Sequence, residues 1–189
     1  MKITKKYPGL TRAKNCDYIL NGSLISEEGI EIDLDDRLFV TGRIKAGWDI
    51  EAVGGITAGC GIEAGRDIEA GDKIESGWGI KSGGGIKAGW DIEAVGGITA
   101  GGGIEAGGGI KAGFDITAGV GIKAGFGITA GWGIKAGTYI DCGKRIFAGT
   151  SVLEDADTCD KTIRCAELRN GTVAYGDLII TKREETNED

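Results

Sequence analysis

The sequence contains no histidine and only one proline among its 189 residues. The absence of histidine excludes a Ser-His-Asp triad, an imidazole general base and histidine metal ligands. No apolar run approaches the length that a membrane span needs, so we expect no membrane partner. The first sixteen residues are basic and lack the apolar segment of a secretory signal. We therefore expect a cytoplasmic protein of a bacterial host.

Cysteine is also sparse, and its spacing indicates no site. The five cysteines form no CxxC pair, which is the usual spacing of a metal or redox site. A catalytic thiolate needs a base beside it, and the chain has no histidine to act as one. We therefore expect no metal, no cofactor and no catalytic residue. The 29 acidic residues outnumber the 22 basic ones, for a formal net charge of −7, which argues against direct binding to nucleic acid.

Glycine is abundant, with 37 residues, but it lacks the period of three that collagen requires. The period is six. From Ile44 to Ser151 there are eighteen consecutive hexads without an insertion. The first position is Ile in all eighteen, the third is Ala in fifteen, the fourth is Gly in sixteen, and the sixth is Gly in ten and Asp in four. Disordered low-complexity sequence does not hold a phase this strictly, so we expect an ordered repeat protein.

The hexad has a direct physical meaning. Its Ile and Ala are two residues apart, so in a strand they point to the same side, while the residue between them points outward. Gly or Asp at the sixth position suits a bend with positive φ. A strand this short cannot bury itself alone, but successive turns of a coil can bury one another. The hexads therefore predict a β-solenoid.

Charge pairs predict how many hexads make one turn. Outward residues in adjacent coils lie close together, so like charges are avoided there. At a spacing of three hexads the outward positions give seven opposite and two like pairs, a better ratio than at two or four hexads. Predicted ladders are Lys45–Glu63–Lys81 and Lys87–Glu105–Lys123–Asp141. We expect an all-β fold, a three-sided parallel β-helix with 18-residue coils of three hexads.

The chain divides into three parts. Residues 1–43 are expected to form an N-terminal cap with irregular first coils, 44–151 the regular solenoid, and 152–189 a C-terminal cap with an acidic tail. Upstream of Ile44, the inward positions are predicted to hold the pairs Ile32/Leu34 and Leu38/Val40. Downstream, the candidates are Val152, Ile163/Cys165 and Val173/Tyr175.

The hexads resemble those of the hexapeptide-repeat family, whose members form left-handed parallel β-helices. Ile44-Lys45-Ala46-Gly47 fits the family frame with the large and small residues exchanged, and the resemblance covers roughly residues 32–151. It implies left-handed coils; the alternative is a right-handed triangular helix, as in the bactofilins, which also has 18-residue coils. The best-known members are trimeric acyltransferases with a catalytic histidine, and some members bind zinc through histidine. This chain has no histidine, so neither activity carries over.

Two groups of residues are candidates for an interaction surface. The fifth hexad position is predicted to lie at a corner, and stacking of three-hexad coils places Cys60, Trp78, Gly96, Phe114, Trp132 and Thr150 on one corner. Trp78, Phe114 and Trp132 would form an aromatic ridge there, or would fold over the neighbouring glycines as ordinary packing. The second group is acidic and lies near the C-terminus: Glu154, Asp155, Asp157 and Asp160. This segment would engage a partner by its charge or simply be a solvated cap.

These features favour a non-catalytic protein-interaction module. One context is a phage or mobile-element protein that inhibits a host defence or nucleic-acid-processing complex, in the manner of an anti-CRISPR protein. An alternative is a structural protein that self-assembles into a bactofilin-like polymer or a phage tail component. A third is an enzyme of the hexapeptide-repeat class that works without histidine. The expected partner is a protein, a second copy of the chain, or both.

Overall fold

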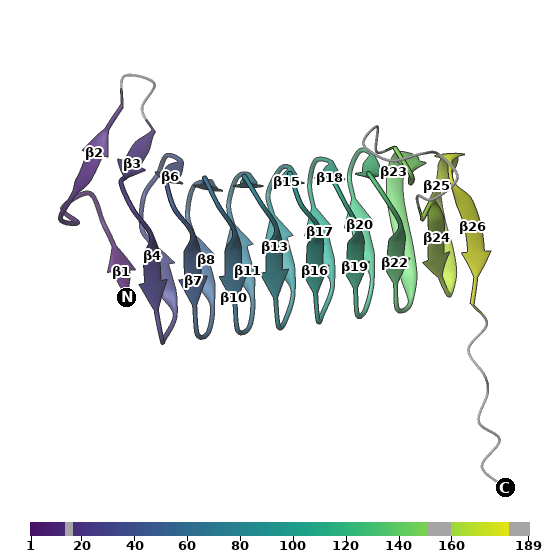
Figure 1. Cartoon of the computed structure of the whole chain (residues 1–189), viewed down its shortest axis with the longest axis horizontal. Helices are drawn as coiled ribbons and strands as arrows, with labels where there is room; N and C mark the ends of the chain where they lie inside the picture. The colour runs from purple at the N-terminus through teal and green to yellow at the C-terminus, as the bar shows by residue number, and fades with distance from the viewer. Residues whose placement is uncertain (14–16, 151–159, 182–189) are drawn as a thin grey trace, which may run out of the picture.

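A computed structural model describes residues 1–13, 17–150 and 160–181. These residues contain strands and turns and no helix, so none of them forms a helix that could cross a membrane. The strands stack as the coils of a three-sided solenoid whose long axis runs from the N-terminal to the C-terminal end (Figure 1). The predicted all-β, parallel β-helical fold is confirmed.

The three faces of the solenoid each contain one strand from every coil. Face 1 is a nine-stranded sheet of β4 (Leu24–Ser26), β7 (Ile44–Ala46), β10 (Ile62–Ala64), β13 (Ile80–Ser82), β16 (Ile98–Ala100), β19 (Ile116–Ala118), β22 (Ile134–Ala136), β24 (Thr162–Cys165) and β26 (Asp177–Ile180). Face 2 contains β1 (Lys2–Ile3), β5 (Ile30–Ile32), β8 (Ile50–Ala52), β11 (Ile68–Ala70), β14 (Ile86–Ala88), β17 (Ile104–Ala106) and β20 (Ile122–Ala124). Face 3 contains β2 (Leu10–Arg12), β3 (Tyr18–Leu20), β6 (Leu38–Val40), β9 (Ile56–Ala58), β12 (Ile74–Ser76), β15 (Ile92–Ala94), β18 (Ile110–Ala112) and β21 (Ile128–Ala130). The long strands β23 (Tyr139–Phe147) and β25 (Glu167–Tyr175) continue both face 2 and face 3.

The regular coils stack with the predicted spacing of three hexads. Ile62 pairs with Ile44 on one side and Ile80 on the other, and the pairing is parallel throughout the hexads. The hexad isoleucines are all buried, and most of the hexad alanines are buried beside them, so the core is a column of Ile and Ala layers along the axis. The residues of both predicted charge ladders are in register, and one ion pair forms in each, with Lys45 Nζ 3.3 Å from Glu63 and Lys123 Nζ 3.0 Å from Glu105. The other steps of the two ladders are neighbours on adjacent strands without an ion pair.

Glycine at the fourth hexad position is explained by close approach between coils. A Cβ on Gly65 would overlap the carbonyl oxygen of Gly47 in the coil before, and the same holds for Gly77 against Gly59.

The prediction of positive φ at the sixth position is wrong. Among the described residues, positive φ occurs at five glycines, none of them at a sixth position: Gly9, Gly22, Gly149, Gly171 and Gly176.

Aspartate at the sixth position has a different role. Its carboxylate accepts a hydrogen bond from a backbone N–H one coil further on, as Asp91 does from Gly109 at 2.7 Å and Asp115 from Gly133 at 3.0 Å. Because an ionised carboxylate is a strong acceptor for a backbone N–H, each aspartate links its corner to the same corner of the next coil. The sixth position therefore stabilises stacking between coils.

The N-terminal end contains one more coil than the hexads indicate. Leu24 pairs with Ile44 and Ile30 with Ile50, a wider spacing than in the regular coils, because the corner before β6 is two residues longer. The predicted pair Ile32/Leu34 is therefore wrong as a register, since Ile30 and Ile32 take the two inward positions and the buried Leu34 lies in the longer corner. The pair Leu38/Val40 is confirmed.

The two ends of the solenoid differ. At the N-terminal end, β1 pairs with β5 and β2 pairs antiparallel with β3, so this segment covers two faces of the first coil (Figure 1). At the C-terminal end, the two halves of β25 are the last strands on faces 2 and 3, and β26 is the last strand on face 1. No described strand pairs with their outer edges. Ile163 and Cys165 are buried as predicted, Val173 is half-buried, and Tyr175 is exposed, while Val152 lies outside the described residues.

Candidate functional site

The aromatic corner forms as the sequence predicts. It joins face 3 to face 1 and consists of Cys60, Trp78, Gly96, Phe114 and Trp132, one residue from each successive coil. Backbone hydrogen bonds link them in order, since Trp78 N–H donates to the Cys60 carbonyl at 3.3 Å and Trp132 N–H donates to the Phe114 carbonyl at 3.4 Å. Thr150 is the exception, because Gly149 rather than Thr150 donates to the Trp132 carbonyl.

The aromatic corner is not one continuous ridge. Gly96 separates Trp78 from Phe114, and the rings on either side of it behave differently. Phe114 and Trp132 pack on each other with ring centroids 4.9 Å apart, and Trp132 is half-buried. Trp78 projects with 69% of its surface exposed, the highest exposure of any large apolar side chain in the described residues. The packing interpretation therefore fits Phe114 and Trp132, and the surface interpretation fits Trp78.

A groove lies beside Trp78 on face 1. It encloses about 570 Å³ and is open to solvent. Arg43, Lys45 and Lys81 line it together with Trp78 and one carboxylate, Glu63. The groove thus has three cations and one carboxylate, although the chain as a whole carries a net negative charge. An exposed indole beside cationic side chains suits a ligand that carries both an apolar group and negative charge.

Sequence spacing alone does not point to the basic residues of this groove. Arg43 follows Gly42, which occupies the aromatic corner in the coil before Cys60, but it precedes the first regular hexad. Lys81 lies three residues after Trp78, on the strand that leaves the corner. Stacking of every third hexad places Gly42 on the same corner as Trp78. Both basic residues could therefore have been predicted to lie near Trp78, by combining each corner position with the outward position on the strand that follows it.

Two exposed aromatic side chains at the other corners are partly covered by cations. Arg66 lies 5.3 Å from the ring centroid of Trp48, and Lys144 lies 4.7 Å from that of Phe126. Such cation–π pairs shield a ring with a neighbouring coil of the same chain. For Trp78, the adjacent coil supplies Val95 at the same corner, with 67% of its surface exposed, so the exposed apolar area there is extended rather than covered.

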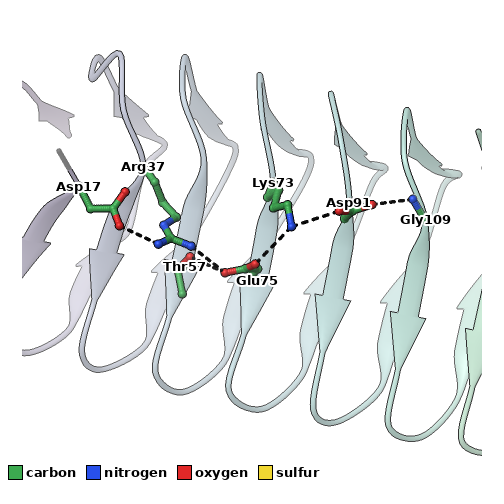
Figure 2. Close-up of polar contacts among 7 residues, drawn as sticks. All are labelled: Asp17, Arg37, Thr57, Lys73, Glu75, Asp91 and Gly109. Atoms are coloured by element: carbon green, nitrogen blue, oxygen red, sulfur yellow. Dashed lines mark hydrogen bonds and ion pairs between the residues drawn. The ribbon is translucent and has the colours of Figure 1, made fainter. Parts of the chain in front are cut away.

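A chain of polar contacts runs along the corner between faces 2 and 3 (Figure 2). Arg37 lies between two carboxylates, 2.6 Å from Asp17 and 3.1 Å from Glu75. Glu75 also accepts a hydrogen bond from the Thr57 hydroxyl at 3.2 Å. Lys73 lies 3.9 Å from Glu75 and 3.1 Å from Asp91, whose carboxylate accepts the Gly109 N–H.

Each cation in this polar chain lies between two carboxylates, which favours a structural role. The hydrogen bond to Asp17 raises the pKa of Arg37, and the hydrogen bond to Asp91 raises the pKa of Lys73. The Gly109 N–H, followed by Lys73, lowers the pKa of Asp91. These shifts hold Arg37, Lys73 and Asp91 in their charged forms at neutral pH, so none of the three is poised to transfer a proton. The polar chain ties successive coils together.

The acidic group predicted near the C-terminus is mostly outside the described residues, since Glu154, Asp155 and Asp157 fall in residues 151–159. Asp160 is described, and its carboxylate accepts the Thr162 N–H at 2.9 Å at the start of β24. This hydrogen bond lowers the pKa of Asp160. A Cβ on Gly133 would lie 3.0 Å from the Asp160 carboxylate, which places Asp160 beside the aromatic corner at Trp132.

Among the described cysteines, Cys142 and Cys165 are buried and Cys60 is exposed, and all three are free thiols. Burial raises the pKa of Cys142 and of Cys165, which disfavours the reactive thiolate. The Cys142 thiol occupies an inward position as predicted and lies 3.0 Å from the Phe126 carbonyl. No group of histidine, cysteine or carboxylate side chains suited to hold a metal ion occurs in residues 1–13, 17–150 and 160–181.

Comparisons with known proteins identified no relative of this chain. No protein-family model matches the chain, and neither a curated protein nor a solved structure matches it. The fold defines its class, a parallel β-solenoid of stacked three-stranded coils, and the function has to be argued from the surface of this chain alone.

Proposed function

We propose that this chain is a non-catalytic protein-interaction module and that Trp78 is the centre of its binding surface. The observation that carries the proposal is the exposure of Trp78 beside a groove of about 570 Å³. Interfaces concentrate their binding energy in a few aromatic and arginine side chains, and the groove offers both Trp78 and Arg43.

The charge of the groove indicates the chemistry of the partner. Arg43, Lys45 and Lys81 line the groove beside Trp78, and Glu63 forms an ion pair with Lys45 at 3.3 Å. A protein segment with an apolar side chain flanked by Asp or Glu complements this surface. The stacked coils hold these side chains on short strands of one sheet and the corners beside them, so binding requires little ordering of the chain.

Two further expectations belong to this proposal. The first is that the chain is a non-enzymatic, left-handed member of the hexapeptide-repeat family. The likeness of its hexads supports membership, and the absence of histidine supports the lack of the family's enzymatic activity. Inhibition of a host defence or nucleic-acid-processing complex by a phage or mobile-element protein is the proposed biological context. The same experiment tests the binding surface and identifies the complex.

The experiment is affinity capture of the tagged chain from a bacterial lysate, with and without nuclease treatment. Trp78→Ala is compared with Trp90→Ala, which removes a tryptophan of similar exposure, 55%, from a different corner. We expect a stoichiometric protein partner with the wild-type chain and with Trp90→Ala, and at least a tenfold loss of recovery with Trp78→Ala. Equal recovery with all three chains would contradict the proposal, as would a partner recovered only without nuclease.

A further inference from the structure

The C-terminal coil leaves an edge of the solenoid open. It is formed by β25 and β26, which pair with the coil before them but with no described strand beyond. The side chains of this edge include Tyr175, Leu178, Ile179 and Ile180, all of them exposed. Leu178 and Ile180 take the two inward positions on face 1, where every earlier coil is covered by the next one.

An open edge of this kind favours pairing with another strand. Native proteins normally protect sheet edges with charges, with proline or with a covering segment, because unpaired backbone groups and apolar side chains associate. β26 contains one charged residue, Asp177, followed by three apolar residues. The proline of the chain lies at position 8, far from this edge.

The N-terminal end is irregular, which limits what the C-terminal edge can meet. β1 and β2 are its last strands on faces 2 and 3, where β2 runs antiparallel to β3, and no described strand pairs with the outer edge of β4 on face 1. Ion pairs hold this segment in place: Lys2 lies 2.6 Å from Glu31, Lys5 3.0 Å from Asp35, and Arg12 2.9 Å from Asp36. The N-terminal end of a second copy therefore presents an irregular, partly antiparallel edge and not a regular coil that would continue the parallel stack. The C-terminal end of a second copy does.

The advance of the chain along the axis determines how two such ends can meet. The last three strands are the first half of β25 on face 2, the second half of β25 on face 3, and β26 on face 1. Because each coil advances by one strand spacing, these strands lie at increasing heights along the axis. A two-fold axis through the middle strand, on face 3, brings the lowest strand of one copy against the highest strand of the other. The differences in height between the last strands of the two copies then compensate each other, so the ends can meet on all three faces.

We propose that two copies of this chain associate tail to tail through their last coils, with the two-fold axis at Val173. In this register each strand at the junction pairs antiparallel with a strand of the other copy. Leu168 of one copy faces Leu178 of the other, and Val173 faces its own copy. Leu168 and Val173 already pack against the core of their own chain, so the contact extends that core across the axis.

The same register makes the outward charges complementary. Arg169 of one copy faces Asp177 of the other, and the symmetry forms this pair twice. Within one chain, Arg169 lies 2.9 Å from Glu167 and 3.9 Å from the ring centroid of Tyr139 in the coil before, and Asp177 lies 4.0 Å from Lys161. Both side chains are exposed, and the pair across the junction forms when they turn from these partners toward the other copy. The apolar contact would supply the affinity, and the two charge pairs would determine the register.

Sedimentation equilibrium on the full chain tests this geometry. We expect a dimer of twice the 19.5 kDa chain mass, in concentration-dependent equilibrium with the monomer. Asp177→Arg places like charges opposite each other and should raise the dimer dissociation constant by about tenfold or more. The double exchange Asp177→Arg with Arg169→Glu restores opposite charges across the axis and should restore the dimer. Asp72→Arg, which makes the same charge change at an exposed corner away from this end, is the control and should leave the dimer unchanged. The circular dichroism spectrum confirms that each variant is folded.

Three results would overturn the inference. The wild-type chain could remain monomeric up to about 100 µM, which corresponds to an association too weak for a specific dimer. It could form assemblies of increasing mass beyond two chains, which would indicate head-to-tail stacking. It could dimerise with no response to Asp177→Arg, which would place the contact elsewhere on the chain.

Discussion

Gly65 packs against the carbonyl oxygen of Gly47 so closely that no side chain fits between them. The two residues occupy the same position of hexads one coil apart, immediately after the paired strands β10 and β7. The contact recurs along the corners, and it is why the fourth hexad position is glycine in sixteen of eighteen hexads.

Gly65→Ala is expected to destabilise the fold. Its Cβ would overlap a backbone atom that cannot move without separating two coils, and overpacking of this kind costs about 1–3 kcal/mol. Gly61→Ala is the control, because a Cβ there would meet the nearest atom at an ordinary distance of 3.4 Å. Urea unfolding followed by circular dichroism should show a lower midpoint for Gly65→Ala alone, and equal midpoints would contradict the packing argument.

Ile98→Asp tests the inward position directly. The Ile98 side chain is fully buried, so an aspartate there would be a charge without a partner in an apolar core, and we expect loss of the folded state or a fall in melting temperature of more than about 10 °C. Thr99→Asp is the matched control, since Thr99 is the outward neighbour on the same strand. Thermal melts of the two variants should differ widely, and a stable Ile98→Asp chain would show that the inward assignment is wrong.

Asp91 should contribute stability that depends on pH. Its pKa is lowered from an ordinary value of 3.8 by the Gly109 N–H and by Lys73, so the folded state favours the ionised carboxylate. The contribution is therefore present above that ordinary value and is lost as the pH falls through the lowered pKa. Chemical unfolding at several pH values should show Asp91→Asn less stable than the wild type at neutral pH, and the difference should shrink in acid. Asp72→Asn, at an exposed carboxylate of the neighbouring coil, should show no such change.

Thiol labelling should distinguish the cysteines of the solenoid. Cys60 is exposed at the aromatic corner, whereas burial raises the pKa of Cys142 and Cys165 and hides both thiols. A short exposure to iodoacetamide at mildly alkaline pH, followed by peptide mass mapping, should modify Cys60 and leave Cys142 and Cys165 unmodified until denaturant is added. Rapid labelling of Cys142 in the native chain would show that the last regular coils open readily.

Most of the fold could be predicted because a single rule governs it. Opposite charges three hexads apart indicated the number of strands in each coil, and the pairs Lys45–Glu63 and Glu105–Lys123 form as expected. The rule failed at the N-terminal end, where a corner two residues longer shifts the inward pair to Ile30 and Ile32. An insertion in a corner leaves no trace in the spacing of charges, so the register there required the structure.

The candidate site was less predictable, for a physical reason. Stacking placed Trp78, Phe114 and Trp132 on one corner, but the exposure of each ring depends on its neighbour along the axis. Trp132 packs on Phe114, whereas Gly96 leaves Trp78 without an aromatic neighbour on that side. Spacing alone identifies the corner of a residue, and only the coordinates show which way the ring turns.

The identical segments 44–59 and 86–101 give the fold a further consequence. They are offset by seven hexads, so the strand that begins the first segment lies on face 1 and the one that begins the second lies on face 2. One sequence therefore builds either face. Gain or loss of a single hexad turns everything beyond it by one third of a revolution while leaving the core intact. Surface residues such as Trp78 can in this way be rotated relative to the solenoid ends during evolution, without any change in the residues themselves.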